Sequence, residues 1–156
     1  MINLYFTLIQ QQSSRRAMHE AQHRAGRLLL CDALGITEDA LKYRENGKPF
    51  LPGGPFFNIS HSGRLALLAV SEDGDIGCDV EEISRQVRNE EAIRMRIAKP
   101  GEEDIPLTQL WVRFEAERKA GGPGWMHEPH IMEGYAAAVC SRAKHCHEIA
   151  VRQNFF

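Results

Sequence analysis

The stretch FFNISHSGRLALLAVSEDGDIGCDVE, residues 56–81, contains the strands that decide the fold. Its apolar runs Phe56–Ile59 and Arg64–Ser71 read as two strands, and the turn EDGD leads into a third run, IGCDVE. A hairpin is the simplest arrangement for neighbouring strands joined by short turns. We therefore predict antiparallel sheet in the middle of the chain.

Helices and further strands are predicted on both sides of this stretch. INLYFTLI (2–9) reads as a strand, and Ser13 or Ser14 caps a helix that runs to about Leu34, where Gly35 supplies a left-handed residue. The Gly/Pro-rich segment 44–55 predicts a loop. The remaining predicted elements are helices over 84–97 and 107–120 and strands over 135–141 and 148–156. This mixture predicts an α+β fold.

Composition limits the class of protein. With 156 residues, 43% of them hydrophobic, the chain suits one compact domain or two small fused lobes. No run approaches the roughly 18 apolar residues of a membrane span, and the first residues lack a secretory pattern, so we expect a cytoplasmic protein. The four cysteines show no CxxC pair, which is typical of reduced thiols. They are Cys31, Cys78, Cys140 and Cys146.

The net charge and its distribution along the chain limit the kinds of ligand that we expect. A net charge of -2 gives no case for nucleic-acid binding. Residues 1–70 carry eight Lys/Arg against five Asp/Glu, so the first part of the chain suits an anionic ligand, whereas the acidic remainder suits metal ligation.

Two carboxylates in GCDVE are candidates for metal binding. Asp79 and Glu81 are two apart on a predicted strand, so both project from one face. A hard ion such as Mg²⁺ offsets their repulsion and leaves positions for phosphate oxygens. The alternative is a solvated acidic strand end.

A helical face in WVRFEAERKAGG (111–122) is the second candidate. Trp111, Glu115 and Lys119 follow one another at intervals of four, so they align along one face. They form either an exposed ion pair or one wall of a site, in which Glu115 serves as metal ligand or base and Lys119 holds a phosphate.

Other histidines and serines are candidates for a catalytic pair or a metal site. Strand alternation puts Ser60 and Ser62 on one face and His61 on the other, which argues against a serine–histidine catalytic pair. His19 and His23 are four apart on a helix, but no third ligand is evident, so an exposed surface is favoured over a metal site. No zinc-site spacing is found in the remaining pairs and runs, which are His127, His130, Cys140, His145, Cys146 and His147.

Four motifs in order resemble those of one enzyme family. GKP (47–49), FNISHSG (57–63), GCDVE (77–81) and WVRFEAERKAGG (111–122) are similar to the motifs of the 4′-phosphopantetheinyl transferases, of the surfactin-synthetase-activating type. The resemblance implies the fold of that family, with two small αβ lobes in pseudo-twofold arrangement and antiparallel sheet. We expect a single domain over 1–156, with lobes of about 1–75 and 76–156.

The resemblance also implies an activity and a site. The family transfers the phosphopantetheine arm of coenzyme A to a serine of an acyl or peptidyl carrier protein, with Mg²⁺ or Mn²⁺, and releases adenosine 3′,5′-bisphosphate. By motif, Asp79, Glu81 and Glu115 match the metal-binding acids, Glu115 is the candidate base, and Lys119 lies near the transferred phosphate. The positions matched to coenzyme A are Lys48, Pro49, Ser60 and His61, to which Arg44 is added without a motif. A monomer or small homo-oligomer is expected.

Three departures from the pattern leave two alternatives. Phe114 stands where the family has lysine, the interval from Glu81 to Trp111 is short, and so is the sequence after Gly124, which predicts a reduced second lobe. One alternative is a catalytically weak relative that binds coenzyme A or a carrier protein. The other is an unrelated metal-dependent phosphotransferase or nucleotide-binding module.

Overall fold

The structure, a computed structural model, describes residues 1–144 and 148–156. Its elements are β1 (Ile2–Leu8), α1 (Arg15–Leu34), a 3₁₀ turn (Glu38–Ala40), β2 (Lys42–Tyr43), β3 (Pro49–Phe50), β4 (Phe56–Ser62), β5 (Leu65–Ser71), β6 (Ile76–Glu82), α2 (Glu90–Ile97), α3 (Leu107–Ala120), β7 (Trp125–His127), β8 (Tyr135–Ser141) and β9 (Ile149–Gln153).

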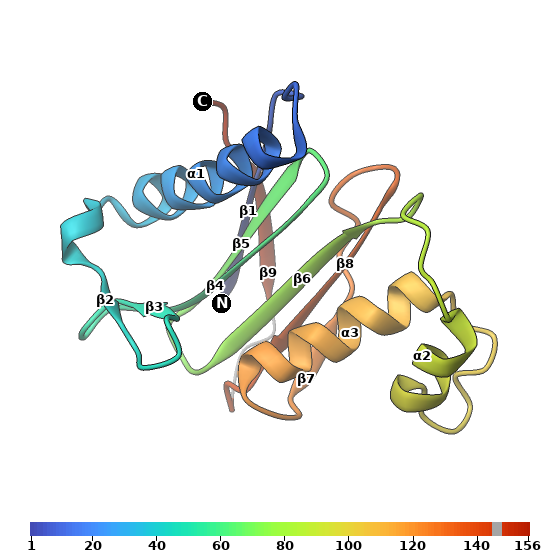
Figure 1. Cartoon of the computed structure of the whole chain (residues 1–156). Coiled ribbons are helices and arrows are strands. Elements are labelled where there is room, and N and C mark those ends of the chain that lie inside the picture. Colours follow the sequence, from blue (N-terminus) through green and yellow to red (C-terminus); the bar gives the residue numbers. More distant parts are fainter. Residues whose placement is uncertain (145–147) are drawn as a thin grey trace.

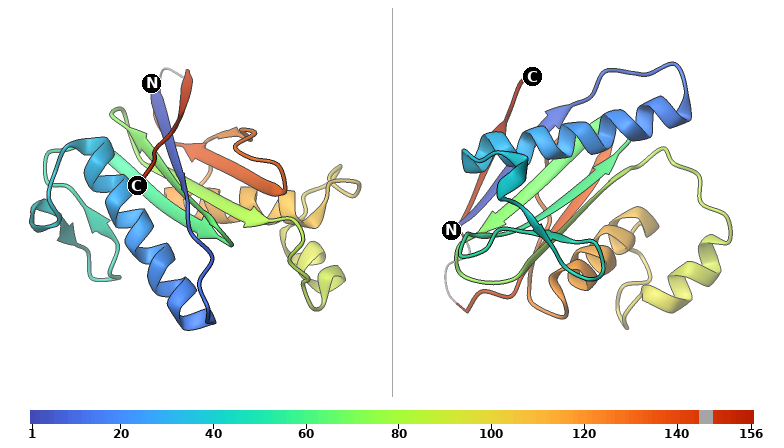
Figure 2. Two further views of the ribbon diagram at one scale, coloured as in Figure 1. Left: turned by 90° about the horizontal axis from the view of Figure 1, so that it is seen from above. Right: turned by 60° about the vertical axis from the view of Figure 1, so that its left-hand side comes forward.

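Among the described residues, the two larger of three sheets lie between α1 and α3, and the third is the pair β2-β3. One sheet has the strand order β4-β5-β1-β9 and carries α1 on its outer face, and the other has the order β6-β8-β7 and carries α3 (Figures 1 and 2). The hairpin β4–β5 pairs antiparallel from Phe56 opposite Ser71 to Ser62 opposite Leu65. The inner faces of the sheets meet in a shared apolar core, so the molecule has four layers.

Alternation along β5 explains why this strand is buried on both faces. Leu65 and Leu67 point into the core between the sheets, whereas Leu68 and Val70 pack against α1. A strand that is covered on both faces typically has a continuous run of apolar residues, and residues 64–70 (RLALLAV) form such a run after the arginine. The strand therefore fixes the helix on one side and the second sheet on the other.

Small residues bring α3 close to the second sheet. Ala116 and Ala120 of α3 pack on Ala136, Ala138 and Cys140 of β8. Because short side chains separate the two backbones, α3 lies directly against the sheet. This closeness places polar side chains of α3 beside β6.

The predicted α+β class is confirmed, and the structure differs from the sequence prediction in several places. The helix predicted over 84–97 begins only at Glu90. The predicted loop 44–55 includes β3 and follows β2, and the three-residue strand β7 was not predicted. The sheet is mixed, because β9 pairs parallel to β1. These pairings join distant segments, so local sequence does not reveal them.

Helix ends follow the predicted signals. The Ser14 hydroxyl accepts a hydrogen bond from the Ala17 amide at 3.1 Å, and Gly35 ends α1 with φ of 63°. Ser and Gly suit these positions because a hydroxyl satisfies a free amide and glycine adopts positive φ without strain.

The described cysteines agree with the expectation of reduced thiols. Cys31, Cys78 and Cys140 are free. Cys146, with its neighbours His145 and His147, lies outside the described residues. In the described part of the chain, no helix has the length and apolar character needed to cross a membrane.

Candidate functional site

A row of polar side chains on β4 joins the two sheets. Strands β4 and β6 belong to different sheets, yet Asn58, Ser60 and Ser62 accept hydrogen bonds from backbone amides of β6. The bonds run from Cys78 N to Asn58 Oδ1 at 2.9 Å, from Val80 N to Ser60 Oγ at 3.3 Å, and from Glu82 N to Ser62 Oγ at 3.0 Å. Buried amides need acceptors, so these side chains replace a backbone ladder along this edge.

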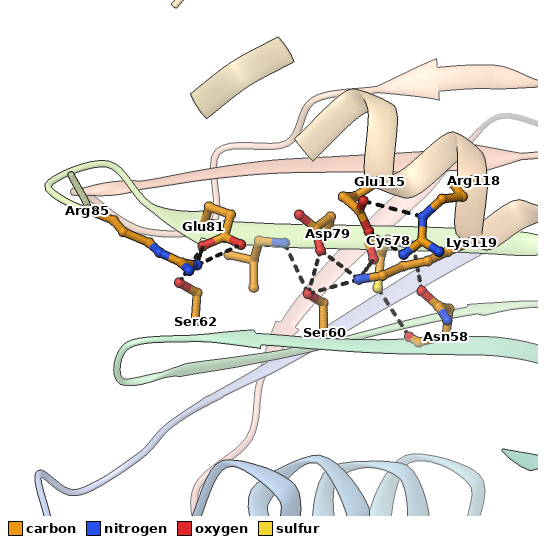
Figure 3. Close-up of polar contacts among 11 residues, drawn as sticks. Asn58, Ser60, Ser62, Cys78, Asp79, Glu81, Arg85, Glu115, Arg118 and Lys119 are labelled. Carbon is orange, nitrogen blue, oxygen red and sulfur yellow. Dashed lines mark hydrogen bonds and ion pairs between the residues drawn. The ribbon is translucent and has the colours of Figure 1, made fainter. Parts of the chain in front are cut away.

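The two serines also donate to the acids of β6. Ser60 Oγ donates to Asp79 Oδ1 and Ser62 Oγ to Glu81 Oε2, each at 2.9 Å (Figure 3). Both hydroxyls are therefore committed to β6, and His61 faces α1 instead. The predicted division of Ser60 and Ser62 from His61 is confirmed.

Lys119 lies at the centre of the site. Its Nζ donates to Asp79 Oδ1 at 2.6 Å, to the Cys78 carbonyl at 3.2 Å and to Ser60 Oγ at 3.4 Å. The helix that carries it approaches β6 at Gly77, where a Cβ atom would lie 2.1 Å from the Ala116 carbonyl oxygen. Glycine at this position thus allows the ammonium of α3 to reach the carboxylate of β6.

Asp79 is a buried carboxylate with one free oxygen. Its side chain is 6% exposed, and burial raises its pKa, against the lowering effects of Lys119 and Ser60. Its Oδ2 has no hydrogen-bond partner among the described residues. A buried acceptor without a partner is costly, so this oxygen is a natural point for a ligand to bind.

The other two predicted acids are paired with arginines. Arg85 Nη1 lies 3.2 Å from Glu81 Oε2, and Arg118 Nη2 lies 2.7 Å from Glu115 Oε2. Glu81 and Glu115 are mostly buried, whereas both arginines are more than 60% exposed. An exposed guanidinium is easily displaced, because exposed ion pairs contribute about 0–1 kcal/mol.

The three acids fit Mg²⁺ in chemical kind. Mg²⁺ binds one or two carboxylates and keeps oxygen ligands from water and phosphate. Asp79 and Glu81 lie on the face of β6 that meets α3, which carries Glu115, and the free oxygen of Asp79 is suited to the ion (Figure 3). Among the described residues no three His, Cys, Asp or Glu side chains form a ready coordination group, and two of these acids are paired with arginines.

A basic cavity of about 830 Å³ opens beside Lys119. Asp75 is the one carboxylate in its described lining. The cations in that lining are Arg44, Lys48, Arg118, Lys119 and Arg142. Such an excess of positive charge in a concave site attracts anions, phosphates above all.

Lys48 connects the GKP motif to α3. Its Nζ donates to the Lys119 carbonyl at 3.0 Å, and burial lowers its pKa. Pro49 lines the same cavity, and the Arg44 guanidinium lies 5.1 Å from the Phe50 ring centroid, in a cation–π contact. The loop and α3 thus present their cations to one space.

The structure brings together most, but not all, of the predicted site. Lys119, Asp79 and Ser60 are in direct contact, and Arg44, Lys48 and Pro49 line the adjoining cavity. His61 does not line that cavity; it lies beside His19 and His23. Burial and these two imidazoles lower the pKa of His61 to about 4.

Three polar residues of this region were missed by sequence reasoning. Arg118 adjoins Lys119 in the fourth motif, and Asn58 lies inside FNISHSG, so both carried a positional signal. Arg142 carried none, because it reaches the cavity only through the position of β8.

Comparison with curated proteins agrees with the motifs. No protein-family profile matches the chain. The 4′-phosphopantetheinyl transferase AcpT of Salmonella typhimurium is 34% identical over 123 residues, which cover 70% of this chain and 64% of the relative. AcpT of Escherichia coli K12 is 35% identical over 114 residues, covering 65% and 58%. The transferase HetI of Nostoc is 31% identical over 128 residues, covering 68% and 54%.

The chain thus spans under two thirds of the length of these relatives. The matches nevertheless extend over 65% to 70% of this chain. The chain is therefore similar to the 4′-phosphopantetheinyl transferases.

Proposed function

We propose that the chain transfers the 4′-phosphopantetheine arm of coenzyme A to a serine of a carrier protein. The observation that carries the proposal is the Lys119–Asp79–Ser60 contact at the edge of a cavity lined by five cations. Coenzyme A combines a pyrophosphate with a 3′-phosphate, so its binding needs several cations in one concave site. The transfer itself needs positioning and charge neutralisation more than covalent catalysis.

Each residue has a role in this proposal. Asp79, Glu81 and Glu115 hold Mg²⁺, or Mn²⁺ in its place. The ion, when bound, neutralises negative charge on the pyrophosphate. Lys119 holds the transferred phosphate, and Lys48, Pro49 and Arg44 bind the adenosine end. Ser60 and His61 are assigned to coenzyme A by the family motif alone.

The reaction exchanges one phosphorus–oxygen bond for another. The carrier serine oxygen bonds to the β-phosphorus, the bond to the bridging oxygen breaks, and adenosine 3′,5′-bisphosphate leaves. Glu115 takes the serine proton, directly or through a water. Its partner Arg118 is 64% exposed, so it can release the carboxylate when the negatively charged substrate enters.

The proposal extends to the molecule as a whole. We propose two lobes in pseudo-twofold arrangement, and the two helix-covered sheets support this division (Figure 1). β9 pairs with β1 of the first sheet, although it follows residue 75 and so belongs to the second lobe of this proposal. A cytoplasmic location and a monomer or small homo-oligomer remain predictions.

Mass spectrometry of a carrier protein tests the proposal. The chain is incubated with coenzyme A, Mg²⁺ and an apo carrier, and a gain of one phosphopantetheine is expected. Asp79→Ala and Glu115→Ala should abolish the gain without unfolding the protein, because each removes a proposed metal ligand. Glu117→Ala, on the same helix, is the matched control and should retain transfer. Normal turnover of either acid variant would contradict the proposed site.

One observation favours a second candidate, a relative that binds coenzyme A with weak or no transfer. Phe114 replaces the lysine of the family pattern, and it lies 38% exposed with its ring centroid 5.9 Å from that of Trp111. An exposed aromatic ring supplies no cation for phosphate or carrier. If the carrier gains no mass while coenzyme A raises the melting temperature, this binding function is the correct one.

A further inference from the structure

Three imidazoles meet between α1 and β4, away from the basic cavity. Ring centroids of His19 and His23 are 4.4 Å apart, and the His61 centroid lies 5.1 Å from that of His23 and 6.2 Å from that of His19. His19 and His23 are exposed, whereas His61 is partly buried. The third imidazole that the sequence did not reveal therefore comes from β4.

The helical pair already has the spacing of metal ligands. The Nε2 atoms of His19 and His23 are 3.2 Å apart. Two imidazole nitrogens that share a tetrahedral Zn²⁺, each about 2.1 Å from the ion, are about 3.4 Å apart. The two histidines belong to the sequence HEAQH, residues 19–23, and H-E-x-x-H on a helix is a pattern that places two zinc ligands on one face.

For His61 to join the pair at one ion, its side chain must change orientation. As the structure stands, no three such side chains of the described residues form a coordination group. Ring centroids of ligands that share a tetrahedral ion are about 5 Å apart, so His61 is already near the required position relative to His23.

A hydrogen bond between His19 and His23 is an alternative explanation for their close approach. One neutral imidazole can donate to the other across 3.2 Å, and this accounts for His19 and His23. It does not account for a third imidazole on the neighbouring strand with its ring near both. We propose that His19, His23 and His61 bind one Zn²⁺, with the fourth position open to water or an anion.

Glu20 takes no part in the proposed zinc site. Its carboxylate is paired with Arg16 Nε at 3.1 Å. The inference therefore concerns binding of a borderline divalent ion and assigns no hydrolysis. It is independent of the transferase proposal, because zinc binding is measured without coenzyme A, to which the family motif also assigns His61.

Calorimetric titration of the intact chain with Zn²⁺ tests the site. His23→Ala and His61→Ala should each weaken zinc binding at least ten-fold, since loss of even an outer-shell partner costs about 10–100-fold in affinity. His130→Ala, an exposed histidine in the loop between β7 and β8, is the matched control and should change the affinity less than two-fold. His145, Cys146 and His147 could also bind Zn²⁺. The site is therefore identified by the loss of zinc affinity in the His23 and His61 variants, and not by the number of zinc ions bound to the wild type.

Thermal unfolding gives a second readout. Zn²⁺ should raise the melting temperature of the wild type and of His130→Ala, and raise it less in the other two variants. Unchanged zinc affinity in His61→Ala would overturn the three-histidine site, even if His23→Ala binds weakly. An absence of zinc binding to the wild type would overturn it as well. Both zinc measurements can be interpreted even if the transferase assay fails, because neither uses coenzyme A or a carrier protein.

Discussion

Replacement of Gly77 by alanine should separate α3 from the second sheet. A Cβ atom at this position would lie 2.1 Å from the Ala116 carbonyl oxygen, 2.4 Å from the Ala120 nitrogen and 2.9 Å from the Lys119 carbonyl carbon. All three atoms belong to the backbone of α3. No change of side-chain rotamer can relieve these contacts, so the helix or the strand must move.

The required movement is large enough to break the central ion pair. To bring 2.1 Å to an ordinary contact of 3.4 Å, the two backbones must separate by about 1 Å. Overpacking of this kind costs about 1–3 kcal/mol. The same shift lengthens the 2.6 Å contact of Lys119 with Asp79, and hydrogen bonds to charged groups contribute about 1.5–3 kcal/mol. We expect Gly77→Ala to lose about 3–5 kcal/mol of unfolding free energy.

Urea unfolding measures this loss, with Gly101→Ala as the control. Gly101 has φ of 89°, and a Cβ atom there would meet nothing within 4 Å. Its replacement therefore carries only the strain of a left-handed residue, about 1–2 kcal/mol. If Gly77→Ala is no less stable than Gly101→Ala, the close approach of α3 to β6 is wrong, and with it the placement of Lys119.

Three further predictions concern an ion pair of α3, a buried hydrogen bond between the sheets and a lysine of the basic cavity. Arg113 lies 2.7 Å from a Glu128 oxygen and lowers the pKa of that carboxyl, so the pair stabilises the fold above the unfolded pKa of about 4.3 and is lost as pH falls through the lower folded value. Urea midpoints should then fall more steeply with acid in the wild type than in Glu128→Gln, and equal slopes would count against the pair. Asn58→Ala leaves a buried amide of β6 without its acceptor and should cost about 1–3 kcal/mol in urea unfolding; a loss within error would contradict the bridge between the sheets. Lys48→Met should weaken coenzyme A binding in calorimetry with little change in stability, whereas Lys42→Met, an exposed control, should bind normally.

Elements with local signals were predictable from the sequence. The bounds 107–120 of α3 and the ends of α1 agree with the prediction, because caps and breakers act within a turn of the helix end. The strands β4, β5, β6 and β8 follow from apolar runs of the right length. Strand alternation along FNISHS also predicted that His61 lies on the opposite face from Ser60 and Ser62.

Other parts depend on contacts between distant residues. β7 is three residues long and forms by pairing with β8, so nothing in its own sequence marks it. α2 begins after Asn89, which has φ of 57° and makes no side-chain cap bond, so the capping contact that usually fixes a helix start is absent there. The third histidine beside His19 and His23 is likewise a consequence of topology, because α1 lies across β4.

The β4 motif holds the two sheets together and shapes the acidic site with the same atoms. Ser60 Oγ accepts from the amide of Val80 and donates to Asp79, so its removal deprives both a backbone group and a carboxylate of a partner. A loss of transfer in Ser60→Ala would therefore not identify a coenzyme A contact. The cation Lys48 meets α3 through a single hydrogen bond to a carbonyl, so its role in ligand binding can be measured apart from the fold. In the β4 motif, therefore, the structural and chemical roles of Ser60 cannot be separated by a single substitution, whereas those of Lys48 can.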